Sequence, residues 1–156
     1  MKGRPEVVEL LNEVLTAELT AINQYFVDSK MFANWGFVRL AASFHDESID
    51  EMKDADKLIE RILYLDGMPN LQRLGVVRVG ETPVEKLQAA GDLEHEAIAR
   101  LNRGIALCVD QADHGSRVLL EEILVGEEEH ADWVEAQLEL IGQVGEAQYL
   151  TQQIHG

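Results

Sequence analysis

The sequence has few of the residues that stabilise small exported or membrane proteins. Its one cysteine, Cys108, allows no disulfide framework and suits a reducing cytosol. No apolar run approaches the roughly 20 residues that cross a bilayer, and no apolar signal core follows Met1. We therefore expect a soluble, cytoplasmic protein that does not enter a membrane.

Basic residues are also scarce. The chain has 13 lysines and arginines against 29 aspartates and glutamates, which gives a formal net charge of −16. This charge argues against nucleic acid as a partner and favours metal cations or self-assembly. The chain has 156 residues, 46% of them hydrophobic, and is long enough to bury one core. We expect a single domain covering residues 1–156.

Prolines, only 3 in number, stand where helices should start or break. Pro5 and Glu6 suit a first helical turn, and Thr82-Pro83-Val84-Glu85 combines a capping threonine with a glutamate three residues later. Apolar residues recur at helical spacing between these signals. The predicted helices cover residues 5–34, 37–64, 83–110 and 116–141, with a short terminal helix over 146–153.

The break between the second and third helices is much longer than the others. Residues 66–81 could reach roughly 50 Å when extended, whereas a helix of 28 residues is about 42 Å long. Leu74, Val76, Val77 and Val79 are also spaced as in an extended strand. The segment can therefore run the length of a bundle. The fold class is predicted to be all-α, a four-helix bundle with one long crossover between helices two and three and a short fifth helix.

Every predicted apolar stripe carries a glutamate near its middle. Glu18, Glu51, Glu94 and Glu127 occupy these positions, and His130 follows Glu127 by one turn. Any one of these acids would more often lie at the edge of its stripe and reach water. Four buried together would need cations, because an unpaired buried carboxylate costs several kcal/mol. Oxygen ligands with an imidazole suit iron, manganese or zinc.

Five stretches of the chain follow a known family pattern: Ala21-Ile22-Asn23-Gln24-Tyr25-Phe26, Asp46-Glu47-Ser48-Ile49-Asp50-Glu51-Met52-Lys53, Glu60-Arg61-Ile62-Leu63, Gly67-Met68-Pro69-Asn70-Leu71 and Gly126-Glu127-Glu128-Glu129-His130. Through them the chain closely resembles bacterioferritin, the haem-containing bacterial ferritin, over nearly its whole length. The resemblance implies a single ferritin-like domain with a di-iron ferroxidase centre, in which Glu51 and Glu127 bridge the irons. It further implies oxidation of Fe(II) by dioxygen or peroxide, and ferric mineral stored in a shell of 24 subunits built from twofold dimers. The ligands it implies are Glu18, Glu51, Glu94, Glu127 and His130.

Asp54 departs from the family pattern. The resemblance predicts a histidine ligand three residues after Glu51, but the sequence reads Glu51-Met52-Lys53-Asp54. A carboxylate oxygen of Asp54 lies two bonds from Cβ, as does the nearer ring nitrogen of a histidine, so Asp54 is itself a candidate iron ligand. The departure leaves the ferroxidase activity open.

Met52 is the candidate cofactor ligand. By helical position alone it would fill a core or an interface. The resemblance instead implies that two Met52 side chains from twofold-related subunits clamp one haem b between them, a ligation that suits electron transfer.

Other residues are open to two interpretations. Tyr25, two turns from Glu18, is either a core residue or a redox neighbour of the iron centre. Asp46 and Asp50 either bind iron on the inner surface of the shell or form a solvated face. Trp133 is expected to serve in packing.

Three interpretations of the function follow. The first is a ferroxidase and iron store, in which oxidation is impaired to the extent that Asp54 cannot replace histidine. The second is a haem-carrying structural subunit that co-assembles with an active, paralogous bacterioferritin subunit. The third is an unrelated helical scaffold, which would purify without metal. The resemblance adds a ferredoxin-type reductase as a candidate partner of the haem.

Overall fold

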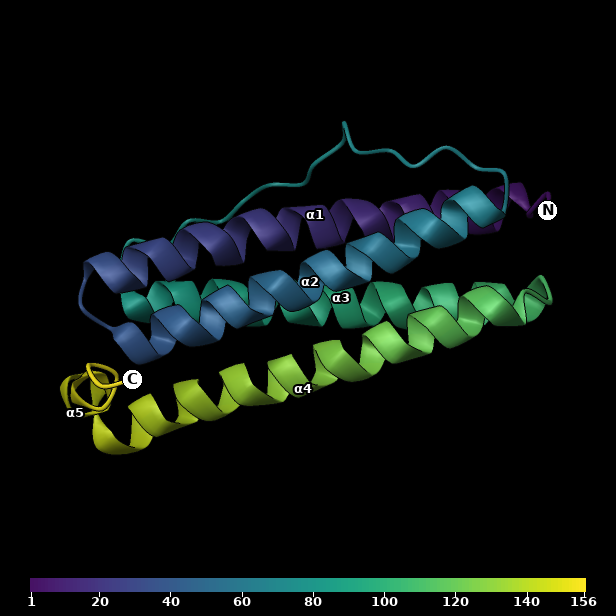
Figure 1. Cartoon of the computed structure of the whole chain (residues 1–156). Helices are drawn as coiled ribbons and strands as arrows, with labels where there is room; N and C mark the ends of the chain where they lie inside the picture. The colour runs from purple at the N-terminus through teal and green to yellow at the C-terminus, as the bar shows by residue number, and fades with distance from the viewer.

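The computed structural model describes residues 1–156, and all of its regular structure is helical. The helices are α1 (Pro5–Asn34), α2 (Val38–Tyr64), α3 (Pro83–Asp110), α4 (His114–Val144) and α5 (Glu146–Thr151) (Figure 1). The predicted all-α fold class is confirmed. None of these helices is both long enough and apolar enough to cross a bilayer.

Two antiparallel helix pairs form the bundle. Figure 1 shows α1 beside α2 and α3 beside α4, with α5 folded back at one end. The turn between α1 and α2 is short because Gly36 adopts a φ of 89°, which a glycine reaches without steric cost. The tail after α5 is joined to the start of α2, where the N–H of Arg39 donates to the carbonyl of Gln153 at 2.9 Å.

Side-chain caps define the starts of α3 and α4. Thr82 accepts a hydrogen bond from the N–H of Glu85 at 3.2 Å, as its sequence pattern predicts. Asp113 accepts one from the N–H of Ser116 at 3.0 Å. Because Asp113 and not Ser116 caps α4, this helix begins at His114, two residues before the predicted start.

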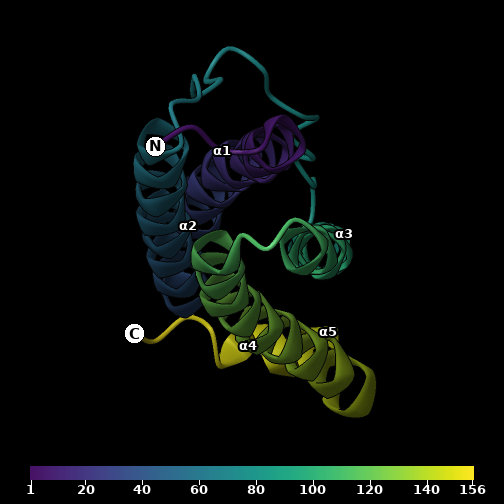
Figure 2. The ribbon, with the colours of Figure 1, turned by 90° about the vertical axis from the view of Figure 1, so that its right-hand side faces the viewer.

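The crossover from α2 to α3 lies along α1, on the outside of the bundle (Figures 1 and 2). It is extended, as predicted, yet it forms no strand because no second strand pairs with it. Side chains of α1 satisfy its backbone instead. Three N–H groups donate in this way: Asn70 to Asn12 Oδ1 at 2.8 Å, Gly75 to Thr20 Oγ1 at 2.8 Å and Arg78 to Gln24 Oε1 at 3.0 Å.

The apolar core is divided into two clusters, one toward each end of the bundle. The first comprises Val7, Leu10, Leu11, Val14, Leu15, Ala55, Leu58, Ile62, Leu65, Leu101, Cys108, Leu120 and Ile123. The second comprises Ala21, Tyr25, Phe32, Leu40, Phe44, Leu87, Ala90, Val134 and Tyr149. On every long helix the two clusters leave a gap near the middle, and each gap contains one of the predicted acidic positions.

A buried ion pair joins α1 to α3 beside the second apolar cluster. Lys86 Nζ lies 2.8 Å from Asp28 Oδ1, and both side chains are fully buried. Burial raises the pKa of Asp28 to about 6, although the hydrogen bond and charge of Lys86 oppose the rise. The ammonium group also lies 5.5 Å from the ring centre of Trp35. Removing either charge alone would therefore leave the other buried without a partner.

Candidate metal centre

The four predicted glutamates converge between the two apolar clusters. Glu18, Glu51, Glu94 and Glu127 come from four different helices, and each is at most 2% exposed. His130 joins them from α4, and its Nδ1 lies 2.9 Å from Glu94 Oε1. The alternative that these acids lie at the stripe edges and reach water is therefore wrong.

Asp54 belongs to one end of this cluster. Its carboxylate oxygen and those of Glu18, Glu51 and Glu127 all lie within 4.8 Å of one another. Two ligand atoms at about 2.1 Å from one metal ion are at most roughly 4.2 Å apart, so a small closure would bring these oxygens onto a cation. This group contains only oxygen donors.

A second group of donors surrounds His130. Its ring nitrogen and carboxylate oxygens of Glu47 and Glu94 lie within 4.8 Å of one another. Glu47 Oε1 is 3.6 Å from His130 Nδ1. Glu47 also groups with Glu51, Glu94 and Glu127, so the two donor groups are contiguous.

The chemistry of these donors fits a pair of metal ions. Glu18 Oε2 and Glu94 Oε2 are buried and have no hydrogen-bond partner. Such atoms normally have partners because burying a charged oxygen without one costs several kcal/mol. Glu47 and Glu94 form ion pairs only with His130. A bound cation would satisfy the lone pairs that the protein leaves free.

Without metal, the cluster holds protons. Burial and the charge of Glu94 raise the pKa of Glu51 well above its usual range. Burial and the charge of Glu51 do the same to the pKa of Glu127. Burial also pushes the pKa of Glu94 upward, but hydrogen bonds from Glu127, His130 and Tyr25 outweigh it and leave that pKa lowered. Glu94 is therefore the ionised acceptor among protonated neighbours.

Three further groups of the centre have raised pKa values. Burial raises the pKa of Glu47 to about 7, against the attraction of His130. Burial likewise raises the pKa of Asp54 to about 6, against the charge of Lys57. Burial would lower the pKa of His130, but its hydrogen bond to Glu94 and the nearby carboxylates raise it overall. Cations entering the centre must displace these protons.

Aromatic residues enclose the histidine side of the centre. The Tyr25 hydroxyl donates to Glu94 Oε1, and burial together with Glu94 raises the pKa of Tyr25 further. Trp133 stacks on the ring of His130, with 5.8 Å between ring centres and 10° between planes. Phe44 packs edge-on against Tyr25. Tyr25 is therefore both a core residue and a direct neighbour of the centre, and Trp133 packs against a candidate ligand.

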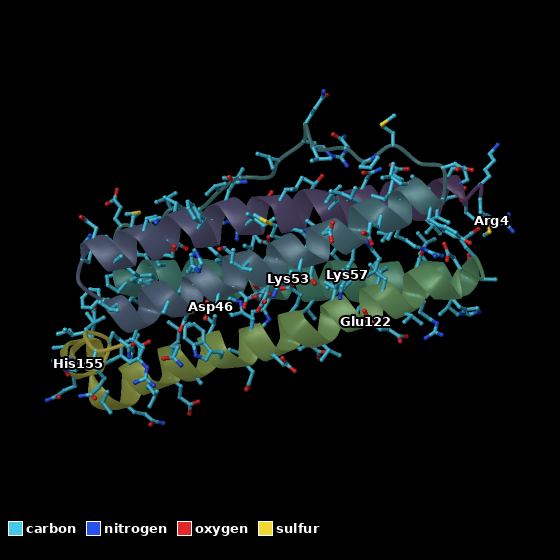
Figure 3. The ribbon with its side chains drawn as sticks, viewed as in Figure 1. Arg4, Asp46, Lys53, Lys57, Glu122 and His155 are labelled. Atoms are coloured by element: carbon cyan, nitrogen blue, oxygen red, sulfur yellow. The ribbon has the colours of Figure 1, made fainter.

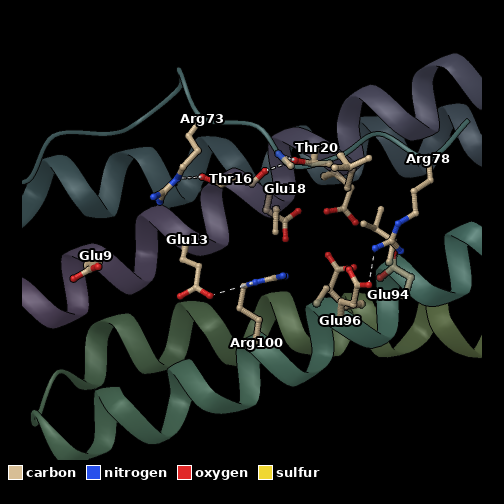
Figure 4. A pocket seen from close by; sticks show the side chains of 18 residues that line it. Glu9, Glu13, Thr16, Glu18, Thr20, Arg73, Arg78, Glu94, Glu96 and Arg100 are labelled. Atoms are coloured by element: carbon tan, nitrogen blue, oxygen red, sulfur yellow. Dashed lines mark hydrogen bonds and ion pairs between the residues drawn. The ribbon is translucent and has the colours of Figure 1, made fainter.

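One cavity reaches the centre from the side of α1, α3 and the crossover. It has a volume of about 390 Å³ and is lined by Glu18, Glu51, Glu94 and Glu127. Arginines and acids surround its mouth, and Arg78 Nη2 lies 2.7 Å from Glu96 Oε1 (Figure 4).

A second cavity reaches the centre from between α2 and α4. It has a volume of about 480 Å³, and its lining includes Glu47, Asp54 and His130. Lys53, Lys57 and Glu122 lie along this face (Figure 3). Because Glu127 lines both cavities, the centre is accessible from two sides of the bundle.

Met52 lies outside the centre. It follows the buried Glu51 on α2 but points to the surface, where it is 53% exposed. Ile49, three residues earlier on the same face of α2, is 37% exposed. The Met52 thioether is therefore accessible to a group outside this chain.

Asp46 and Asp50 are both exposed, with side-chain exposures of 83% and 64%. Asp50 lines the cavity between α2 and α4, whereas Asp46 does not. The position of Asp50 agrees with either a solvated face or iron binding on the inner surface of the shell.

Glu47 is the donor that is absent from the predicted ligand set. It lies one turn before Glu51 and so shares the same face of α2, which was the available signal. The orientation of its carboxylate toward His130 became visible only in three dimensions.

Known proteins show the same sequence pattern over almost the full length. Residues 8–144 match the Ferritin family, described as a ferritin-like domain. The chain is 53% identical over 152 residues to Bacterioferritin of Mycobacterium leprae, covering 97% of this chain and 96% of the relative. It is 51% identical over 151 residues to Bacterioferritin of Streptomyces coelicolor, covering 97% and 90%. It is 42% identical over 149 residues to Bacterioferritin of Brucella melitensis, covering 96% and 92%.

Proposed function

Because the chain belongs to the bacterioferritin family, we propose that it is an iron-storage subunit that oxidises Fe(II) at its buried acidic centre. Iron storage follows from the family. The observation that supports oxidation at this site is the convergence of Glu18, Glu94 and their neighbours, with two buried carboxylate oxygens free to bind cations. Glu18, Glu51, Asp54, Glu94, Glu127 and His130 are the proposed ligands.

The carboxylates of the centre bind the charge of the substrate iron. Two Fe(II) ions entering through either cavity displace the protons held by Glu51 and Glu127, which become anionic ligands. Each iron gives up one electron, and the pair reduces dioxygen, with two protons, to peroxide. The carboxylates stabilise the higher charge of Fe(III) more than that of Fe(II). Ferric product then leaves for the interior of the shell.

Stopped-flow absorbance after mixing Fe(II) with the aerobic protein tests this proposal. Glu127→Gln should slow ferric formation strongly because it removes an anionic donor from the centre. Glu128→Gln is the matched control, since Glu128 is the next residue on α4 but is exposed. Equal rates for both variants and the unmodified chain would refute oxidation at this centre.

The haem-carrying structural subunit remains the second candidate, and Asp54 supports it. A site whose first donor group lacks histidine differs from the pattern that the resemblance implies. This second function predicts that the homopolymer oxidises Fe(II) slowly. It also predicts that a shell mixed with an active bacterioferritin subunit oxidises Fe(II) fast.

Assembly into a closed shell of 24 subunits is part of the proposal. The six-residue α5 is too short to be stable alone and needs packing partners. Exposed apolar side chains such as Phe26, Met52 and Leu74 also fit subunit interfaces. Analytical ultracentrifugation at micromolar concentration should show one large species, and a population of monomers or dimers alone would count against the shell.

Haem b shared between two subunits completes the proposal, with Met52 as the residue that would hold it. When bound, haem would supply one-electron transfer to the stored iron. Met52→Leu should keep the fold, because the two side chains have similar volumes, and should abolish the bound-haem absorption spectrum. A six-coordinate haem spectrum retained by this variant would remove Met52 from the site.

A further inference from the structure

The donors of the centre form two groups of different chemistry. The group of Glu18, Glu51, Asp54 and Glu127 offers four carboxylates and no nitrogen. The other group contains the imidazole of His130 with Glu47 and Glu94. Carboxylate-only sites suit hard cations such as Mn²⁺, whereas an imidazole favours Zn²⁺ and similar divalent ions.

Glu47 is placed to act as a ligand in the second group. Its Oε1 lies 3.6 Å from His130 Nδ1, a separation that two ligands of one metal ion commonly have. The side chain is only 16% exposed and lines the cavity between α2 and α4. It faces Glu94, whose Oε2 is buried without a partner. A cation inserted here would contact Glu47, Glu94 and His130 together.

We propose that Glu47 is a metal ligand and that the centre holds two unequal cations, one bound by oxygens alone and one bound by Glu47, Glu94 and His130. This inference rests on the proposed function and names the ligands and the selectivity of the same centre. Asp54 makes the first site oxygen-only, and Glu47 adds an anion to the second.

The charge of the enlarged set has a consequence for iron. Glu18, Glu47, Glu51, Asp54, Glu94 and Glu127 together make six carboxylates. When ionised, these six match the charge of two Fe(III) ions and exceed that of two Fe(II) ions. The set therefore favours the ferric state, since each anionic ligand gains more from the higher metal charge.

Sequential binding of Zn²⁺ and Mn²⁺ to the metal-free, assembled protein tests the two-site arrangement. One equivalent of Zn²⁺ per chain should fill the site of His130. One equivalent of Mn²⁺ added next should then bind to oxygens alone. Pulsed electron paramagnetic resonance of the Mn²⁺ should accordingly show no hyperfine coupling to nitrogen. A nitrogen coupling on this Mn²⁺ would overturn the assignment.

Glu47→Gln tests the new ligand, with Asp46→Asn as the matched control on the exposed side of the same helix. Calorimetric titration should show the Zn²⁺ dissociation constant of Glu47→Gln raised by about tenfold or more, with the Mn²⁺ site little changed. Glu47→Asp, whose carboxylate is one methylene shorter, should weaken Zn²⁺ binding less and serves if the glutamine variant misfolds.

Failure of Glu47 as a ligand and failure of the proposed centre give different results. If Glu47→Gln binds Zn²⁺ as tightly as Asp46→Asn does, Glu47 is not a ligand, although the oxidation centre can still stand. If the unmodified chain itself binds fewer than two divalent ions, both the inference and the proposed centre fall.

Discussion

Metal binding to this centre should release protons, and the number released depends on pH. The test is a titration of the metal-free protein with Co²⁺, a divalent ion that air does not readily oxidise when carboxylates and imidazole bind it. Glu51 and Glu127 hold protons because their pKa values are raised. Glu47 and Asp54 titrate at about 7 and about 6. Binding requires all four to be ionised.

The size of the effect follows from these pKa values. At pH 6.5, Glu47 should hold about 0.8 of a proton and Asp54 about 0.2, so these two release about one proton together. Glu51, Glu127 and His130, whose pKa values are raised as well, should add to this number. For each proton released on binding, the apparent binding constant increases about tenfold per pH unit.

The sign of the pH dependence is fixed by the direction of the shifts. A carboxyl group with a raised pKa keeps its proton to a higher pH in the folded, metal-free chain. Low pH therefore opposes metal binding. The apparent affinity should therefore increase as pH rises through about 6 to 7, the range in which Asp54 and Glu47 ionise. The same shifts make the metal-free protein less stable as pH rises through this window.

Calorimetry in buffers of different ionisation enthalpy counts the protons directly. At pH 6.5 we expect more than one proton per centre, and Glu47→Gln should release about 0.8 fewer. Asp46→Asn should leave the count unchanged, because Asp46 is exposed and outside the donor groups. A proton count near zero at pH 6.5, or an affinity that does not change between pH 6 and 7, would refute this account of the centre.

Three further substitutions test separate parts of the structure. Asp54→His should speed both Fe(II) turnover and mineral growth, because it removes one anion that holds ferric iron. If stopped-flow absorbance shows neither rate changed, Asp54 is not a ligand. Lys86→Met should lower the free energy of unfolding by about 3–5 kcal/mol in urea titrations, since it leaves the buried Asp28 unpaired. Replacing Asp28 by leucine as well should recover most of that loss, and no recovery would mean that packing, not charge, caused it. Thr20→Val should cost about 1–3 kcal/mol, because Gly75 loses the acceptor of its N–H. Hydrogen exchange at the Gly75 amide should then become faster, whereas unchanged protection would show that another group holds the crossover.

The helices and the topology could be predicted from the sequence because they depend on local rules. Helical periodicity places Glu18 or Glu94 on an apolar face whatever the rest of the chain does. Pro5 in a first helical turn and Thr82 as a cap mark the starts of α1 and α3. The length of residues 66–81 determines that helices two and three run parallel, because a shorter link could not span the bundle. The predicted convergence of the acids therefore needed no knowledge of side-chain contacts.

Only the tertiary structure decided how the converging side chains are divided. Periodicity specifies the face of a residue but not its depth along a neighbouring helix or the direction of its carboxylate. Asp54 lies in the donor group of Glu18, whereas Glu47 lies in the donor group of His130. Which group each residue belongs to depends on how far the helices are displaced along one another. The Asp28–Lys86 pair joins residues 58 positions apart, and the α1 acceptors of the crossover join residues 54 to 58 apart. Contacts over such separations depend on how the helices pack, and no local pattern in the sequence predicts them.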